Sequence, residues 1–382
     1  MSDVNTGNLW DIFCRVIDNY GDVGVSWRLA AGLAARGQRV RLWLDDPSAL
    51  TWMAPNGAPN VEVRRWTEPM RLTGLETCNV LIETFGCEIY PEFIASRAID
   101  TPARGKKLLW INLEYLTAEG YAERCHGLLS PVMNEPGAGL TKHFFYPGFT
   151  PATGGLLREP DLLERQTRFD KEVWLRAQSI DFKGECLISL FCYEPSALGT
   201  WLNRLAQDPQ PTRLLVTPGR SAEALRTCIS SKNSLQPSWN EHESLSFSYL
   251  PPLTQLDFDH LLWACDLNFV RGEDSLVRAL WANKPFIWQI YPQHDDAHHA
   301  KLAAFLDMMN APQSLRTAHL AWNGVSRSQA DNTENGLARA LPHWQRAVAR
   351  VRDTLLAQDD LVTQLLRLCS KKRVSGFECV SG

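Results

Sequence analysis

Several features are missing from this chain of 382 residues, and each absence narrows its class. No apolar stretch approaches the roughly 20 residues of a membrane span, and the start, MSDVNTGNLWDIFC, lacks the cationic and apolar segments of a signal peptide. The ten cysteines include no CxxC pair, which is typical of reduced thiols. A net charge of −4 leaves no basic excess to indicate nucleic-acid binding. We therefore expect a cytoplasmic protein that binds neither membranes nor nucleic acids directly.

Short apolar runs alternate with helical patterns in both halves of the chain. Strands are predicted over residues 9–17, 40–44, 80–82, 108–111, 186–192, 213–217, 245–250, 267–270 and 285–290. Such alternation predicts a mostly parallel sheet with helices on both faces. Because the pattern occurs twice in a chain too long for one ordinary core, we expect an α/β protein of two doubly wound, Rossmann-like domains.

The expected domain boundaries follow from composition. We predict an N-terminal domain over residues 1–150 and a connection over 151–184, rich first in Gly and Pro and then in charge. The second domain is expected over residues 185–349. The helical pattern over 350–382 is expected to pack back on the first domain.

The loop over residues 18–24 (DNYGDVG) follows the first predicted strand and carries two carboxylates four residues apart. It is not GxGxxG, so a dinucleotide site is weakly indicated. One interpretation is structural: Asp22 caps a helix over 24–35, which Gly37 ends, and Asp18 holds the turn. The other makes the two carboxylates a clamp for a cationic substrate, or a base. Both interpretations stay open at this point.

A second motif, RGEDS, covers residues 271–275. The predicted strand 267–270 ends at Arg271 and Gly272, and Asp274 and Ser275 are both suited to capping a helix over 275–281. The N-terminus of such a helix attracts phosphate, and the arginine adds a cation. An ordinary βαβ unit whose turn needs a glycine explains the pattern equally well.

A third motif, FCYE, covers residues 191–194 at the end of a predicted strand. In a strand, Phe191 and Tyr193 point the same way. They are expected either in the core, which is the commoner outcome, or against a ligand at the carboxyl end of the strand.

Two spacings can hold a metal ion. His294 and His298 are one helical turn apart with Asp295 and Asp296 nearby, which suits zinc, but no third ligand set is evident. Asp257 and Asp259 form a DxD string that also opens a predicted helix, where acidic residues suit the dipole. We expect the DxD string to stabilise the start of the helix, and we expect no metal site.

From residues 249–255 (YLPPLTQ) through RGEDS to the acidic and histidine-rich tail, the second half resembles the nucleotide-sugar half of GT-B glycosyltransferases. Together with FCYE and the segment DIFCRVIDNYGDVGVSWRLA, it resembles the elongation factor P arginine rhamnosyltransferases over essentially the whole chain. The resemblance implies a GT-B fold whose two domains face across a cleft. It also implies inverting transfer of L-rhamnose from dTDP-β-L-rhamnose to an arginine of elongation factor P, which activates that factor.

The resemblance assigns roles to residues as well. Asp22 matches the proposed base of that family, Asp18 matches a second required carboxylate, and Glu273 matches a carboxylate implicated in catalysis. No cofactor beyond the donor substrate is implied. The expected donor-binding residues are Asn19, Tyr20, Gly21, Phe191, Tyr193, Pro252, Gln255, Arg271, Gly272, Asp274 and Ser275.

This chemistry suits the residues. A guanidinium is protonated at neutral pH, with a pKa above about 12, so two carboxylates can hold it in a fork and take a proton only as the new bond forms. Glu273 cannot attract phosphate, so it is expected to orient sugar or ribose hydroxyls or to position Arg271. Other classes stay open: a GT-B transferase with another substrate, a nucleotide-sugar epimerase, an oxidoreductase that uses the first Gly-rich loop, or a non-catalytic binding module.

Overall fold

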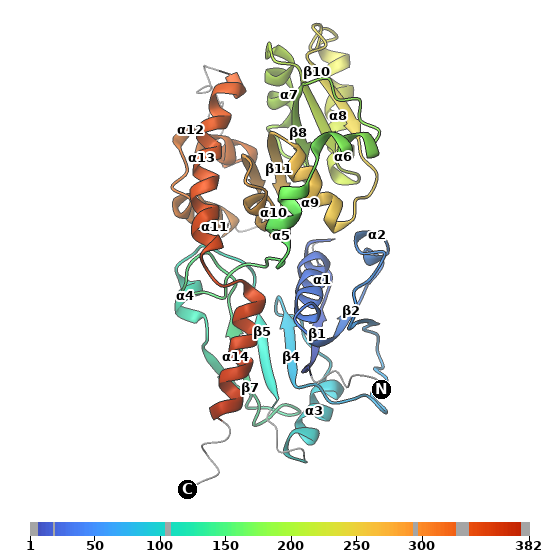
Figure 1. The fold of residues 1–382 in the computed structure, drawn as a ribbon, viewed down its shortest axis with the longest axis vertical. Coiled ribbons are helices and arrows are strands. Elements are labelled where there is room, and N and C mark those ends of the chain that lie inside the picture. Colours follow the sequence, from blue (N-terminus) through green and yellow to red (C-terminus); the bar gives the residue numbers. More distant parts are fainter. Residues whose placement is uncertain (1–6, 18–19, 104–107, 293–296, 326–335, 376–382) are drawn as a thin grey trace. The chain divides into compact units, whose positions relative to one another are not determined.

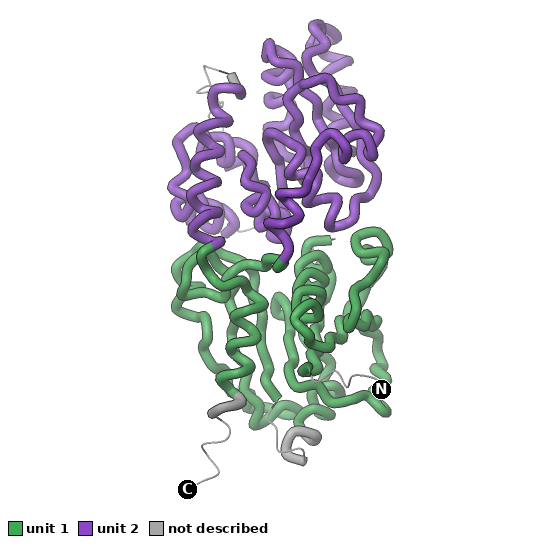
Figure 2. Tube along the Cα trace, viewed as in Figure 1, with its two compact units in different colours: residues 1–160, 357–382 green, residues 161–356 purple. Residues whose placement is uncertain are grey.

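The structure is a computed structural model that describes residues 7–17, 20–103, 108–292, 297–325 and 336–375. The chain divides into two compact units, shown in different colours in Figure 2. Unit 1 comprises Met1–Pro160 with Ala357–Gly382, and unit 2 comprises Asp161–Leu356. Each unit is built on its own mostly parallel sheet (Figure 1), as the alternation of strand and helix patterns predicts.

The sheet of unit 1 has the order β3-β2-β1-β4-β5-β7-β6, and every pair is parallel except β6 with β7. At its centre, Trp10 lies opposite Val40 on one side and Val80 on the other. The strands are β1 (Leu9–Cys14), β2 (Arg39–Leu44), β3 (Val61–Arg65), β4 (Val80–Thr84), β5 (Leu109–Leu113), β6 (Leu129–Pro131) and β7 (Thr141–Phe145). The helices are α1 (Gly21–Ala34), α2 (Leu50–Met53), α3 (Pro91–Ala103), α4 (Tyr121–Cys125) and α14 (Leu361–Ser375).

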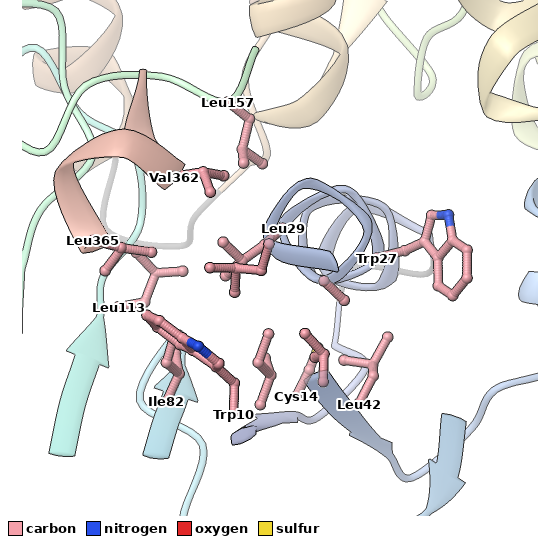
Figure 3. Close-up of a cluster of buried hydrophobic side chains, with 14 of the residues drawn as sticks. Trp10, Cys14, Trp27, Leu29, Leu42, Ile82, Leu113, Leu157, Val362 and Leu365 are labelled. Atoms are coloured by element: carbon pink, nitrogen blue, oxygen red, sulfur yellow. The ribbon is translucent and has the colours of Figure 1, made fainter. Parts of the chain in front are cut away.

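Successive side chains of a strand point to opposite faces of the sheet, so both faces of this sheet are apolar and helices cover both. In β1, Trp10 and Ile12 enter a core with α1 and α14, whereas Phe13 enters a second core with α3. Figure 3 shows the first core, in which Leu29 of α1 lies near Val362 and Leu365 of α14. The last described helix of the chain therefore completes the core of the first unit.

One glycine permits the close approach of α14 to α1. A Cβ on Gly32 of α1 would lie 3.1 Å from a methyl group of Val362, which is tighter than ordinary contact. An ion pair fixes the same junction, since Arg36 Nη2 lies 2.8 Å from Asp360 Oδ2.

The sheet of unit 2 has the order β10-β9-β8-β11-β12 and is parallel throughout. Its strands are β8 (Cys186–Leu190), β9 (Thr212–Val216), β10 (Leu245–Tyr249), β11 (Leu267–Arg271) and β12 (Phe286–Gln289). Its helices are α5 (Leu162–Arg168), α6 (Lys171–Ala177), α7 (Leu198–Gln207), α8 (Arg220–Leu235), α9 (Gln255–Ala264), α10 (Asp274–Ala282), α11 (Ala297–Met308), α12 (Gln313–Trp322) and α13 (Gly336–Leu356).

Helices cover both faces of this second sheet too. Residues of α6 and α9 form one core with Leu187 and Leu215. On the other face, Phe269 of β11 lies against Trp201 of α7 and Trp322 of α12, with ring centroids 5.1 and 4.3 Å apart. Among the described residues, no helix has the length and hydropathy needed to cross a membrane.

Several element boundaries differ from the expectations. The first strand ends at Cys14 rather than at residue 17, because Arg15 is exposed and Ile17 is 63% exposed. Helix α1 begins at Gly21 rather than at 24, since Gly24 N–H already donates to Tyr20 O at 2.9 Å. Glycines are poor helix formers, so the pattern placed the start too late.

Some elements were not predicted at all. Strands β3, β6 and β7 were missed because their residues alternate in exposure or are mostly exposed, which gives no continuous apolar run. The segment 151–184, expected as a connection, contains α5 and α6.

Candidate functional site

The strand order changes direction once in each sheet. In unit 1 the chain passes outward from β1 through β2 and β3 and then returns to β4, and in unit 2 the same return places β11 beside β8. In open parallel sheets, ligands bind beyond the carboxyl ends of the strands at such switch points. The loop that follows β1 lies at the first of them, and FCYE and RGEDS follow the two strands that form the second.

In unit 1, Asp22 is the second residue of α1 and is 4% exposed. Its Oδ2 accepts a hydrogen bond from Ile17 N–H at 2.9 Å, so one carboxylate oxygen closes the loop between β1 and α1. The N-cap is Tyr20, without a side-chain capping bond. The interpretation of Asp22 as the cap was therefore wrong, although a structural role in the loop is observed. An anionic group in the first helical turn is also favoured by the dipole.

The surroundings of Asp22 are only partly described. Asp18 and Asn19 lie outside the described residues, so the pairing of the two carboxylates stays a prediction. Tyr20 is 45% exposed and its ring meets Trp52 edge-on at 5.1 Å. Burial raises the pKa of the Cys14 thiol to about 12, with a smaller contribution from the Asp22 charge. The thiol beside Asp22 is therefore neutral.

In unit 2, Arg271 is fixed from several directions. Its Nη1 donates to Cys192 O at 2.9 Å, and its Cζ lies 4.5 Å from the ring centroid of Phe191 and 4.6 Å from that of Tyr193. The residue is 8% exposed. The structure therefore brings FCYE and RGEDS together, with the Arg271 guanidinium of RGEDS against the two aromatic rings of FCYE. Tyr193 is itself only 1% exposed, which agrees with the core alternative for its ring, and its expected contact with the donor stays a prediction.

The turn of RGEDS is held by backbone geometry and one hydroxyl. Gly272 has a φ of 65°, and its carbonyl accepts from Trp288 Nε1–H at 2.7 Å. Ser275 Oγ accepts from Arg271 N–H at 3.0 Å and donates to Arg271 O. The expectation that Asp274 or Ser275 caps the helix was wrong. Helix α10 begins at Asp274 and its N-cap is Glu273, whereas the Ser275 hydroxyl bonds the backbone of the turn.

Glu273 forms an ion pair that the sequence did not indicate. Lys301 Nζ, in α11, donates to Glu273 Oε1 at 2.5 Å, and the two side chains are about one-fifth exposed, at 21% and 19%. The observed partner of this carboxylate is therefore a cation 28 positions away in the chain.

The segment before α9 completes the described surroundings. Gln255 is the first residue of α9 and is 8% exposed, whereas Pro252 is exposed. Phe258, in the first turn of α9, meets the Phe191 ring edge-on at 5.3 Å. This contact brings the α9 segment to the FCYE motif.

Two charged residues near these motifs were missed by the sequence reasoning. Arg220 begins α8, and its Cζ lies 4.8 Å from the Tyr193 ring. Lys301 pairs with Glu273. A signal existed for Arg220, because residues 217–221 (TPGRS) repeat the pattern of strand, glycine and helix seen at RGEDS.

The DxD string has other partners. Asp257 and Thr254 form the start of α9, with Thr254 Oγ1 accepting from Asp257 N–H at 3.0 Å. Asp259 is buried and bonds Arg278 through both oxygens at 2.8 and 2.7 Å. Asp257 thus serves the helix start, as expected, whereas Asp259 binds Arg278 in the core, which was not expected. His294, Asp295 and Asp296 lie outside the described residues, and among those described no cluster of His, Cys, Asp and Glu suits a metal.

A hollow of about 500 Å³ lies at the opposite edge of the unit 1 sheet, where β1, β2 and β3 begin. Three of its lining arginines are paired: Arg39 with Glu76 at 2.6 Å, Arg41 with Asp11 at 2.6 Å and Arg64 with Glu62 at 2.7 Å. It contains none of the predicted site residues and lies at the end of the strands that ligands rarely use.

Two doubly wound units with polar motifs at their switch points define the GT-B class of glycosyltransferases. A solved structure described as the structural basis for EarP-mediated arginine glycosylation of translation elongation factor EF-P matches with a TM-score of 0.63 and 29% identity, over 95% of this chain and 99% of that one. A glycosyltransferase from Rickettsia africae, with a TM-score of 0.50 and 8% identity over 96% and 98% of the two chains, shares the fold.

The sequence comparisons give the family. The profile of the elongation factor P (EF-P) rhamnosyltransferase EarP matches residues 10–370, and the chain belongs to that family. A protein-arginine rhamnosyltransferase of Pseudomonas aeruginosa is 42% identical over 379 residues, 94% of this chain and 98% of the relative. One from Neisseria meningitidis is 38% identical over 307 residues, 78% of this chain and 77% of the relative.

Proposed function

We propose that this protein is a protein-arginine rhamnosyltransferase that transfers L-rhamnose from dTDP-β-L-rhamnose to an arginine of translation elongation factor P, with inversion and without a metal ion. Membership of the family supports the class of reaction, since the family profile matches residues 10–370. The position of Arg271 supports the donor site. This cation is fixed at the switch point of the unit 2 sheet, against two aromatic rings.

The donor is assigned to unit 2. Arg271 and the N-terminus of α10 are suited to the diphosphate, because both are positive and neither needs to reorganise when charge develops on the leaving group. Phe191, Gln255 and Pro252 lie beside that end of the sheet and are assigned to the rest of the nucleotide. Glu273, held by Lys301, is assigned to hydroxyl groups of the sugar or ribose.

The acceptor arginine is assigned to the carboxylates of unit 1. The guanidinium starts protonated, so Asp22 cannot deprotonate it fully in advance. In the proposed step, a guanidinium nitrogen attacks the anomeric carbon from the face opposite the diphosphate. The bond from that carbon to the diphosphate oxygen breaks, and the nitrogen loses its proton to Asp22. Asp18 is assigned to aligning the guanidinium.

Intact-mass analysis tests the proposal directly. Elongation factor P is incubated with the protein and dTDP-rhamnose, and peptide mapping locates any added mass. A gain of one rhamnose on an arginine is expected. A control reaction uses elongation factor P whose modified arginine is replaced by lysine. No gain with dTDP-rhamnose, or a gain only with UDP-sugars, would refute the donor assignment.

A further inference from the structure

A second arginine lies against the same tyrosine ring as Arg271. Arg220 is the first residue of α8, which follows β9 through Gly219 with a φ of 76°. Its Cζ is 4.8 Å from the Tyr193 ring centroid, and that of Arg271 is 4.6 Å from it. The two guanidinium carbons are therefore less than about 10 Å apart, with one aromatic ring shared between them.

The backbone around Arg220 is tied to the FCYE motif. Ser221 Oγ accepts from Cys192 N–H at 2.9 Å and donates to Cys192 O at 3.0 Å. Thr217 Oγ1 donates to Leu190 O at 3.0 Å. These bonds are buried, so the start of α8 holds its place relative to Tyr193 and Arg220 is delivered to this edge of the sheet.

Arg220 and Arg271 are held in different ways. Arg220 is paired through two contacts with Glu194, of which Nε to Oε1 is 2.7 Å, and the two side chains are 38% and 54% exposed. This hydrogen bonding, with a smaller effect of Arg271, lowers the pKa of Glu194, which therefore stays ionised. An exposed ion pair contributes only about 0–1 kcal/mol. A phosphate can therefore replace the carboxylate of Glu194 on Arg220, whereas Arg271 is buried and already held in place by Cys192 O and the rings of Phe191 and Tyr193.

We propose that Arg220 is a second diphosphate-binding residue of the donor site, which exchanges Glu194 for the phosphate oxygens when the nucleotide sugar binds. The inference rests on the proposed function for the identity of the donor. A diphosphate carries at least two negative charges and gains another as the glycosidic bond breaks. Arg271 and one helix terminus, worth about half a charge, do not balance it. Arg220 supplies a further positive charge of the kind that a metal ion would otherwise provide.

Calorimetry with dTDP and ligand-observed NMR with thymidine test the proposal on the full chain. Arg220→Gln is expected to weaken dTDP binding about 10–100-fold, the range for loss of one charge-assisted contact, and to leave thymidine binding unchanged. Arg226→Gln is the matched control, because Arg226 lies on the same helix, is exposed and stacks on Tyr249 at 4.6 Å. It removes the same charge and should change neither affinity.

Glu194→Gln supplies a second test. Without its carboxylate competitor, Arg220 should bind dTDP severalfold more tightly, and this gain should vanish in the Arg220→Gln background. Equal losses of dTDP and thymidine in Arg220→Gln would overturn the proposal, since they would show that Arg220 only supports Tyr193. Unchanged dTDP affinity would overturn it too.

Failure of the proposed function gives a different result. If the unaltered protein binds UDP instead of dTDP, the donor assignment fails, and the same variants measured with UDP and uridine decide the role of Arg220. If the protein binds no nucleoside diphosphate at all, both proposals are overturned.

Discussion

Replacement of Asp22 by asparagine separates its proposed chemistry from its observed structural role. In the structure, Asp22 Oδ2 accepts the Ile17 N–H at 2.9 Å. The amide oxygen of asparagine can accept the same bond, so the loop between β1 and α1 should keep its shape. What the substitution removes is the negative charge and the basic oxygen.

The two roles predict effects of different size. Loss of a general base slows turnover about 10²–10⁴-fold, equivalent to about 3–5 kcal/mol in activation free energy. The structural cost is expected to be smaller, about 0.3–1 kcal/mol, because the amide keeps the Ile17 hydrogen bond and loses the interaction of a charge with the N-terminus of α1. We therefore expect Asp22→Asn to melt within a few degrees of the unaltered protein, to bind dTDP normally and to be severely impaired in turnover.

A carboxylate that follows β2 and bonds the backbone of the same loop offers a matched control. Asp45 Oδ1 accepts the adjacent Val16 N–H at 2.9 Å, so Asp45→Asn removes a carboxylate with the same kind of structural bond and no proposed chemical role. Initial rates of elongation factor P modification, measured by intact mass, should stay near normal for this variant. Near-normal turnover of Asp22→Asn, or an equal loss in Asp45→Asn, would refute the assignment of Asp22 as the base.

Three further predictions follow from the geometry. Arg271→Ala should weaken dTDP binding by about 1.5–3 kcal/mol in calorimetry, because a charge-assisted phosphate contact is lost; unchanged affinity in a folded variant would remove Arg271 from the phosphate site. Activity should survive EDTA, since in the proposed mechanism Arg271 and the start of α10 take the place of a metal ion; loss on chelation with rescue by manganese or magnesium would contradict that mechanism. Burial lowers the pKa of His319 from 6.5 to about 4, so below pH 6.5 the unfolded chain binds a proton that the folded chain excludes. The free energy of unfolding should therefore fall between about pH 6.5 and pH 4, by about 2–3 kcal/mol from this group. In denaturant titrations at pH 7 and pH 5, His319→Leu should show a smaller decrease, and an equal decrease would count against this account.

The Arg271 turn shows how far local sequence reaches. The sequence predicted a strand over 267–270, a turn at Arg271 and Gly272 and a helix after it, and the structure has β11, a Gly272 with positive φ and α10 at those places. It also predicted that this helix would end at residue 281, and α10 ends at Ala282, followed by Asn283 in the left-handed conformation with a φ of 55°. These features depend on propensities of neighbouring residues, which the sequence carries directly. The predicted capping roles were wrong, because the Ser275 hydroxyl bonds the backbone of the turn rather than the start of the helix.

Contacts between distant segments could not be predicted in this way. Nothing local indicates that Lys301 pairs with Glu273, that Arg220 stacks on Tyr193, or that Val362 fits over Gly32. Each depends on strand order and helix packing, which are settled by the burial of side chains far apart in the chain. Thus the sequence by itself determined the α/β alternation, the turn at Arg271 and the resemblance to a family. Only the tertiary structure decided which charges meet at the ends of the strands, because that meeting depends on how β8, β9 and β11 lie side by side.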